Sequence, residues 1–266
     1  MTCEPANPKG CGTVDVWQET FPVRFGAIDK SDKLTLDAVF QFFQEAAICH
    51  AENLGVGRQD MGQTGQAWIL SRITVLVDRR PDYCETITVR TWPRGSDKLF
   101  AMRNYDIRDS SDTPVVRAKS GWLVVDMEKR RPLRPNSLMD KLPSNEGKES
   151  LSPDEGGAAS LSERSNLQKT AERKALYTDI DYNGHVNNVR YIQWIEDALA
   201  SRYLEKADKM RLDINYLNEI LDGDVIEIFS GKIEDETAAM WNHAFAFEGR
   251  KENGQPAFRA ELRLTE

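Results

Sequence analysis

The stretch "YTDIDYNGHVNNVRYIQWIEDAL", residues 177–199, has a counterpart earlier in the chain, "FGAIDKSDKLTLDAVFQFFQEAA", residues 25–47. At a constant offset of 152 residues, Asp29 pairs with Asp181, and apolar positions in one segment match apolar positions in the other. Internal similarity at a fixed offset is the mark of a repeated structural unit. The sequence therefore predicts two copies of one unit, with both segments in the same place in their copy.

Each copy continues with the same succession of patterns. Apolar side chains recur at helical spacing over residues 36–47 and again over residues 189–199, which predicts one amphipathic helix per copy. Strand patterns, several of them alternating, follow at 68–78, 85–92, 99–109 and 115–126, and then at 210–220, 224–233, 238–249 and 257–266. One strand, one helix and about four strands, repeated twice, predict an α+β fold in which each helix covers an antiparallel sheet.

Residues 140–166 separate the two copies. They are rich in Ser, Glu, Gly and Pro and contain no aromatic residue, which is typical of a linker. We therefore expect an N-terminal unit over residues 1–139, a polar linker over 140–166 and a C-terminal unit over 167–266. Two such units can pair edge to edge as a pseudo-dimer.

Composition narrows the class of protein. The chain has 266 residues and a net charge of −8, which argues against general nucleic-acid binding. No apolar run approaches the roughly 20 residues that span a bilayer, and the N-terminus does not resemble a secretory signal. Four cysteines show neither a metal-ligand nor a disulfide pattern, so we expect reduced thiols and a cytoplasmic location. These cysteines are Cys3, Cys11, Cys49 and Cys84.

Polar residues cluster just before the second helix. Asp181, Asn183, His185 and Asn187 occupy alternate positions, and in an extended segment their side chains would share one face. Such a set can serve as a reaction centre, and a helix N-terminus near Asn187 and Asn188 offers backbone N–H groups to an oxyanion. The alternative is a plain turn followed by a helix cap.

The first copy helps to choose between these interpretations. It has Asp29, Ser31 and Lys33 at the matching positions, so the turn persists without the imidazole and the amide. At an offset of 139 residues Glu219 pairs with Arg80, so the first copy also lacks this carboxylate. Partial burial of Glu219 between apolar neighbours would favour its protonated form and suit it to proton transfer. We therefore expect chemistry in the second copy.

The segment "DIDYNGHVNNVRYIQWIED", residues 179–197, resembles the D-x-N-x-H-V-N-N-x-x-Y-I-x-W motif of the acyl-acyl-carrier-protein thioesterases. These enzymes release fatty acids during fatty-acid synthesis. Residues 68–77 and 85–135 also resemble blocks of the first half of that family. The resemblance implies a tandem hotdog fold, with two antiparallel sheets that each wrap around one long helix.

The resemblance also implies roles for individual residues. It assigns catalysis to Asp181, Asn183, His185 and Glu219, the substrate to a fatty acyl thioester on acyl carrier protein, and no cofactor. Plant members have a cysteine directly after the glutamate, where this chain has Ile220. We therefore expect hydrolysis by activated water without a thiol nucleophile, or attack by Asp181 itself.

The binding surfaces follow from the same resemblance. The first unit would hold the acyl chain as a catalytically vacant copy, with candidate contacts from Phe40, Phe43, Trp68, Leu70, Trp92 and Trp122. An acidic carrier protein would need a local basic surface on this acidic chain. Two runs qualify, one with Lys129, Arg130, Arg131 and Arg134 and the other with Lys169, Arg173 and Lys174. The resemblance also leaves room for a homodimer.

Three different functions fit parts of the pattern. A hotdog hydroxyacyl-carrier dehydratase would pair a histidine with an acid on the central helix, where Glu196 and Asp197 lie. An acyl-CoA thioesterase would share the hydrolytic residues, and a non-catalytic acyl-binding module would share only the fold. Metal catalysis has little support, because His50, His185 and His243 lack metal-ligand spacing.

Overall fold

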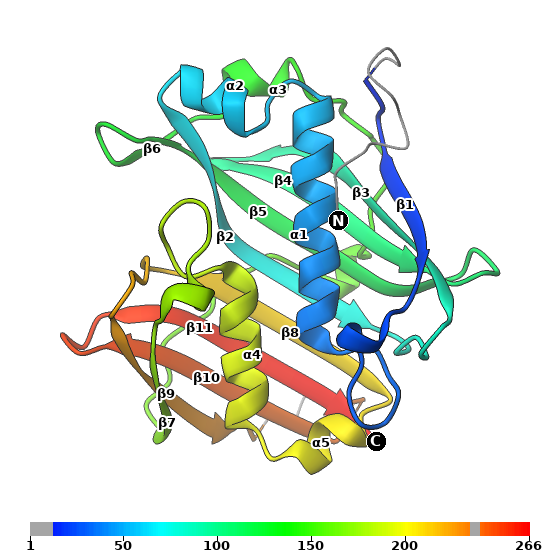
Figure 1. Cartoon of the computed structure of the whole chain (residues 1–266), viewed down its shortest axis with the longest axis vertical. Helices are drawn as coiled ribbons and strands as arrows, with labels where there is room; N and C mark the ends of the chain where they lie inside the picture. Colours follow the sequence, from blue (N-terminus) through cyan, green and yellow to red (C-terminus); the bar gives the residue numbers. More distant parts are fainter. Residues whose placement is uncertain (1–12, 235–239) are drawn as a thin grey trace.

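Eleven strands form one antiparallel sheet in the computed structural model, which describes residues 13–234 and 240–266 (Figure 1). The strand order is β1-β3-β4-β5-β2-β8-β11-β10-β9-β7, and β6 pairs with β5. The strands of each copy are therefore contiguous in space. Their bounds are β1 Trp17–Pro22, β2 Gln66–Val77, β3 Thr86–Asp97, β4 Phe100–Arg108, β5 Pro114–Asp126, β6 Arg131–Leu133, β7 Gln168–Lys174, β8 Lys209–Tyr216, β9 Val225–Lys232, β10 His243–Lys251 and β11 Pro256–Thr265.

The two copies join where β2 pairs with β8 over six residue pairs. At this seam the Thr74 hydroxyl donates to Asp213 Oδ1 at 2.6 Å, and both residues are buried. A buried polar group needs such a partner to offset its lost hydration. The edge-to-edge arrangement considered from the sequence is therefore a continuous hydrogen-bonded sheet.

One central helix from each copy lies on the same face of this sheet (Figure 1). In α1, Leu36–Asn53, the Thr35 hydroxyl accepts a hydrogen bond from the Ala38 N–H and so caps the helix. The apolar side of α1 is buried against the first sheet, and α4, Asn188–Ala198, buries Ile192 and Ile195 against the second. The remaining helices are α2 Arg58–Gln63, α3 Asn136–Met139 and α5 Ser201–Glu205, with 3-10 turns at Phe25–Ala27, Pro153–Glu155 and Tyr177–Asp179.

Residues 140–166 pack along the opposite face of the sheet. Ser150 donates to the Ala118 carbonyl at 2.5 Å, the Ala158 N–H donates to Thr74, and the Leu161 N–H donates to Asn215. The segment thus connects the copies and also covers sheet surface that would otherwise face water. Its composition is that of a linker, but its backbone is held by hydrogen bonds.

The predicted α+β architecture of antiparallel strands with one central helix per copy is confirmed, but the two predicted sheets join edge to edge into one. The predicted strands match β2–β5 and β8–β11, although residues 238 and 239 at the start of one prediction lie outside the described residues, as do Cys3 and Cys11. Across the described residues no helix is long and apolar enough to cross a membrane. Over the same ranges no cluster of three or more His, Cys, Asp or Glu side chains forms a metal site.

Candidate active site

Asp181 to His185 form a closed turn directly before α4. The Asp181 N–H donates to the His185 carbonyl at 2.7 Å, and the Gly184 N–H donates to the Asp181 carbonyl at 3.0 Å. Gly184 has a φ of 80°, a left-handed conformation that glycine adopts at little cost. The expectation of an extended segment with alternating faces is wrong here, because the backbone folds back on itself.

The turn brings His185 to Glu219. His185 Nε2 lies 3.0 Å from Glu219 Oε2, although 34 residues separate the two in the chain. The Val186 N–H donates to the Ile220 carbonyl at 2.8 Å, and this bond holds the turn against the segment after β8. Glu219 is exposed, with 39% of its side-chain surface accessible, so the expected partial burial is wrong. The site is open to water.

The N-terminus of α4 offers fewer free backbone N–H donors than expected. Asn187 is the N-cap of α4, and its side chain accepts from the Val189 N–H at 2.9 Å. The Asn187 backbone N–H already donates to the Asp179 carbonyl at 2.8 Å, so Asn187 cannot offer it to an oxyanion. Asn188 opens the helix, and its N–H therefore has no acceptor within the helix. Of the two predicted backbone donors, only Asn188 keeps that capacity.

The first copy reproduces this turn almost bond for bond. The Asp29 N–H donates to the Lys33 carbonyl at 3.0 Å, as Asp181 does to His185. The Ser31 N–H donates to Asp29 Oδ1 at 2.8 Å, and in the second copy the Asn183 N–H donates to Asp181 Oδ1 at 2.7 Å. The two copies therefore share one backbone scaffold.

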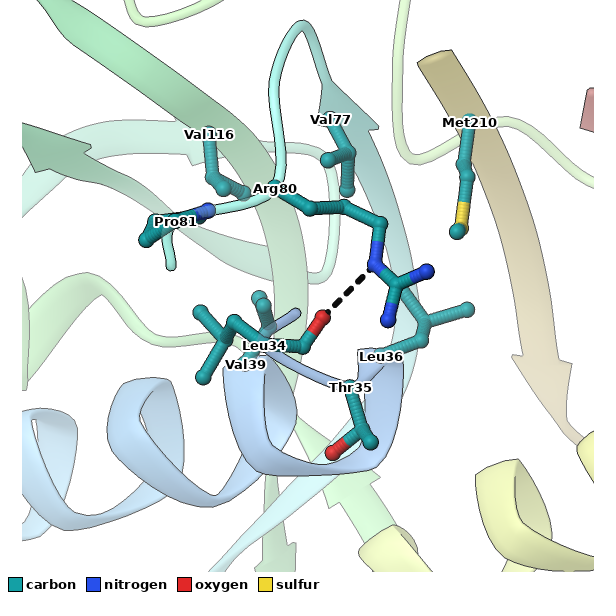
Figure 2. A pocket seen from close by; sticks show the side chains of 9 residues that line it. All are labelled: Leu34, Thr35, Leu36, Val39, Val77, Arg80, Pro81, Val116 and Met210. Carbon is teal, nitrogen blue, oxygen red and sulfur yellow. Dashed lines mark hydrogen bonds between the residues drawn. The ribbon is translucent and has the colours of Figure 1, made fainter. Parts of the chain in front are cut away.

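The side chains on this scaffold differ in charge and in access. The Leu34 N–H donates to the Pro81 carbonyl at 2.9 Å, matching the Val186–Ile220 bond, so Arg80 stands where Glu219 stands in the other copy. Arg80 is 5% exposed and reaches Asp29 Oδ2 at 2.5 Å and the Leu34 carbonyl at 2.9 Å. Figure 2 shows Arg80 among apolar side chains that include Val39 and Val77. In the first copy a buried arginine thus fills the position that Glu219 has in the second copy.

The buried Arg80 side chain also changes the pKa of the Asp29 carboxyl. Burial by itself acts to raise the pKa of Asp29, yet hydrogen bonds from Ser31 and Arg80 bring that pKa below its ordinary value. The carboxylate is therefore held as an anion by its neighbours. In the second copy the matching residue, Asp181, has no arginine at the matching position, because Glu219 occupies it.

Tyr191 belongs to the candidate site but was not selected from the sequence. Its side chain is buried in α4. Burial raises the pKa of Tyr191 well above its ordinary value, and the charges of Asp181, Asp224 and Glu219 add to this effect. The motif contains this tyrosine. Its hydroxyl at a core-facing position of the predicted helix was a sequence signal that could have identified it.

Two residues of the first copy also reach the site. Arg130, between β5 and β6, places a guanidinium nitrogen 2.5 Å from Glu219 Oε1. Arg58, at the start of α2, stacks on the ring of Tyr182 in the turn before α4. These contacts join segments far apart in the chain, so no local pattern in the sequence reveals them.

Most of the predicted acyl contacts lie on the sheet face that α1 covers. Leu70 and Trp122 are register partners on this face, and Phe43 packs on Tyr105 with ring centroids 4.8 Å apart. Trp68 packs beneath α2, with its indole N–H donating to the Val56 carbonyl, and Phe40 is buried in α1.

Trp92 does not share that face. Its indole N–H donates to the Lys148 carbonyl at 2.7 Å, and the neighbouring Asn104 side chain donates to the same carbonyl. Lys148 belongs to the segment that covers the opposite side of the sheet. The expectation that Trp92 lines the same slot as the other five residues is therefore wrong.

The acids on α4 do not pair with His185. Glu196 accepts from the Leu36 N–H at 3.2 Å, at the N-terminus of α1, and Asp197 pairs with Arg173 at 3.1 Å. Glu196 lies eight residues beyond the start of α4, which is about 12 Å along the axis. This arrangement argues against a dehydratase, which needs a histidine beside a helix acid.

Comparison with known proteins identifies a family for both copies. The acyl-ACP thioesterase N-terminal domain matches residues 14–139, and the acyl-ACP thioesterase C-terminal domain matches residues 162–261. A chloroplastic palmitoyl-acyl carrier protein thioesterase from Cuphea hookeriana is 27% identical over 83% of this chain. The chain spans 57% of the length of that relative.

Solved structures show the same fold over nearly the whole chain. An acyl-ACP thioesterase from Bacteroides thetaiotaomicron superposes with a TM-score of 0.79 at 25% identity, covering 94% of this chain and 98% of the other. A 12:0-ACP thioesterase from Umbellularia californica, 20% identical, gives a TM-score of 0.81 over 95% and 98% of the two chains. The two family domains cover both copies of the repeat, and the chain belongs to the acyl-ACP thioesterase family.

Proposed function

We propose that this chain hydrolyses the thioester of a fatty acyl chain on acyl carrier protein and releases the free fatty acid. The observation that carries the proposal is the contact between His185 and Glu219 on a turn whose other copy holds Arg80 instead. The first copy folds without the histidine and the glutamate, so the second copy does not need these two side chains to fold. Membership in the thioesterase family supports this substrate class.

The reaction begins with water near His185. An ionised Glu219 only accepts hydrogen bonds, so His185 Nε2 carries the proton in the neutral ring and Nδ1 presents its lone pair. His185 Nδ1 takes a proton from water as the water oxygen bonds to the thioester carbon. The carbon–sulfur bond then breaks, and the proton passes from His185 to the departing thiolate. Glu219 stabilises the imidazolium between these two steps.

Three further groups act on this reaction. The Asn183 side chain holds the attacking water or the carbonyl oxygen, and the Asn188 N–H stabilises the oxyanion. Asp181 orients the turn, because its Oδ1 is already bound by the Asn183 N–H at 2.7 Å. A single turnover in ¹⁸O-labelled water tests this role: label must appear in the fatty acid only, and label in the Asp181 carboxylate would mean direct attack.

The proposal assigns different roles to the two copies and to the segment between them. Residues 1–139 bind the acyl chain on the α1 side of their sheet, residues 140–166 connect the copies, and residues 167–266 carry the catalytic groups. A cytoplasmic location and a homodimer stay part of the proposal. A gel-filtration mass equal to one chain would remove the homodimer.

Docking of the acidic carrier protein is assigned to Arg131 and Arg134 of the first basic run. In the second run Lys169 pairs with Glu227 at 2.6 Å and Arg173 pairs with Asp197, so their charges are already neutralised. Arg131 and Arg134 are exposed, and Arg131 directly follows Arg130, whose guanidinium contacts Glu219. Replacing both by glutamate must raise KM for carrier-bound substrate and leave a small thioester unaffected. Equal losses on both substrates would contradict this docking surface.

Thiol release from acyl-acyl-carrier proteins of different chain lengths tests the whole proposal. The wild-type chain must release free thiol, and His185→Ala must remove turnover while it keeps the unfolding temperature. An enoyl product without thiol would support a dehydratase. Binding without turnover would support a non-catalytic module, and faster release from acyl-CoA than from the carrier would support a CoA thioesterase.

A further inference from the structure

The turn between β5 and β6 touches the candidate catalytic pair. Arg130 in this turn belongs to the first copy, yet its guanidinium nitrogen lies 2.5 Å from Glu219 Oε1. The other carboxylate oxygen, Oε2, lies 3.0 Å from His185 Nε2. Glu219 therefore bridges a cation from the first copy and the imidazole of the second, with one oxygen for each.

This bridge fixes the direction of the carboxylate. Glu219 has three rotatable side-chain bonds and is 39% exposed, so packing alone does not hold it. Lys251 holds the neighbouring main chain by donating to the Glu219 carbonyl at 3.0 Å, but this bond does not restrain the side chain. A second contact on Oε1 leaves Oε2 directed at His185. Arg130 supplies that contact.

Charge attraction alone contributes little here. The Arg130 side chain is 72% exposed, and ion pairs in water of this kind add little to stability. Geometry matters more, because displacing a reacting group by about 1 Å can slow catalysis by up to about a hundredfold. The effect of Arg130 should therefore appear in the turnover number and not in the unfolding temperature.

We propose that Arg130 is a positioning residue for the thioesterase reaction, which holds Glu219 in line with His185 from the first copy. The inference rests on the proposed function. It makes the site composite: the second copy supplies the reacting groups, and the first copy supplies the group that aligns them. It also separates Arg130 from its neighbours in the basic run; Lys129, for example, pairs with Asp126.

The test uses the full-length enzyme with two substrates. One is a fatty acyl thioester on acyl carrier protein, and the other is the matching acyl N-acetylcysteamine thioester, which is small, uncharged and free of phosphate. The variants are Arg130→Gln and Arg130→Lys. Lys98→Gln is the matched control, because Lys98 is also an exposed basic residue with positive φ, 55° against 49° for Arg130, in the turn of the β3–β4 hairpin.

Arg130→Gln should lower kcat about tenfold on both substrates, with KM within twofold, and Arg130→Lys should recover most of the loss. Lys98→Gln should match the wild type. A loss confined to KM on the carrier-bound substrate would overturn the inference and place Arg130 in the docking surface. Unchanged kinetics would also overturn it. If Arg130→Gln fails to fold, Arg130→Met, which keeps an unbranched stem, repeats the measurement. A wild-type enzyme inactive on both substrates would instead refute the proposed function.

Discussion

Replacing Arg80 by methionine tests the interpretation of the first copy as a closed site. The change removes the guanidinium and keeps most of the aliphatic stem. It takes hydrogen bonds from the Asp29 carboxylate and from three backbone carbonyls, those of Lys33, Leu34 and Leu204. Because Leu204 belongs to the second copy, the change also removes a link between the two copies.

The size of the effect follows from burial. Removing one member of a buried ion pair costs about 3–5 kcal/mol, because the partner loses its compensation. Asp29 is 23% exposed and regains some hydration, so we expect the lower end, about 3 kcal/mol. At about 2–4 °C per kcal/mol the apparent unfolding temperature should fall by about 6–12 °C.

Thermal unfolding followed by circular dichroism at pH 7 measures this shift. Arg79→Met is the control, since Arg79 is 42% exposed, and its pair with Glu85 should contribute about 1 kcal/mol or less. At 25 °C the Arg80→Met enzyme should keep kcat within twofold of the wild type, because Arg80 lies in the copy that lacks a counterpart of the His185–Glu219 pair. A shift below 2 °C, or a loss of turnover at an unchanged unfolding temperature, would refute the reasoning.

Three other predictions follow from the site and the seam. Glu219→Gln should lower kcat about a hundredfold without lowering the unfolding temperature, since Glu219 is exposed; steady-state kinetics and calorimetry check both. Tyr191→Phe, which removes a buried hydroxyl near Asp181 and Glu219, should lower kcat several-fold, while urea titration should show a stability change of about 1 kcal/mol or less. Burial and the charge of Asp37 raise the pKa of Glu196 from 4.5 to about 8 in the native state. Between these two pH values the native state keeps a proton that the unfolded state loses. The stability of the protein should therefore fall as pH rises from about 4.5 to 8. Glu196→Gln should match the wild type near pH 4.5 and unfold at a higher temperature at pH 8; parallel pH curves for the two proteins would contradict this.

Local pattern was sufficient to predict the elements and the repeat. The helical spacing around Phe40 and the alternation in β9 depend on neighbours a few residues apart, and a strand or helix forms wherever such a pattern can bury one side. The correspondence between Arg80 and Glu219 was also readable, because each lies six residues before the start of the next strand, β3 at Thr86 and β9 at Val225.

The sequence-based predictions were wrong where a turn formed in place of an extended segment and where burial was inferred from apolar neighbours in the sequence. Asp181 to His185 closed into a turn because Gly184 accepts a positive φ, so period-two alternation did not apply. Glu219 follows the end of β8, where the chain leaves the core, so its apolar neighbours did not bury it. Trp92 was grouped with the acyl-chain candidates because the sequence does not show which face of β3 it occupies, and its bond to the Lys148 carbonyl places it on the face that residues 140–166 cover.

The sequence by itself determined the two-copy architecture and the polar set that distinguishes the copies, because both are encoded in spacing along one chain. The tertiary structure alone decided the contact between His185 and Glu219, the burial of Arg80 against Asp29, and which first-copy side chain reaches the second copy. Arg130 and Glu219 are 89 residues apart, and Arg80 and Leu204 are 124 apart. Contacts over such separations depend on how sheets and turns meet in space, which no local periodicity records.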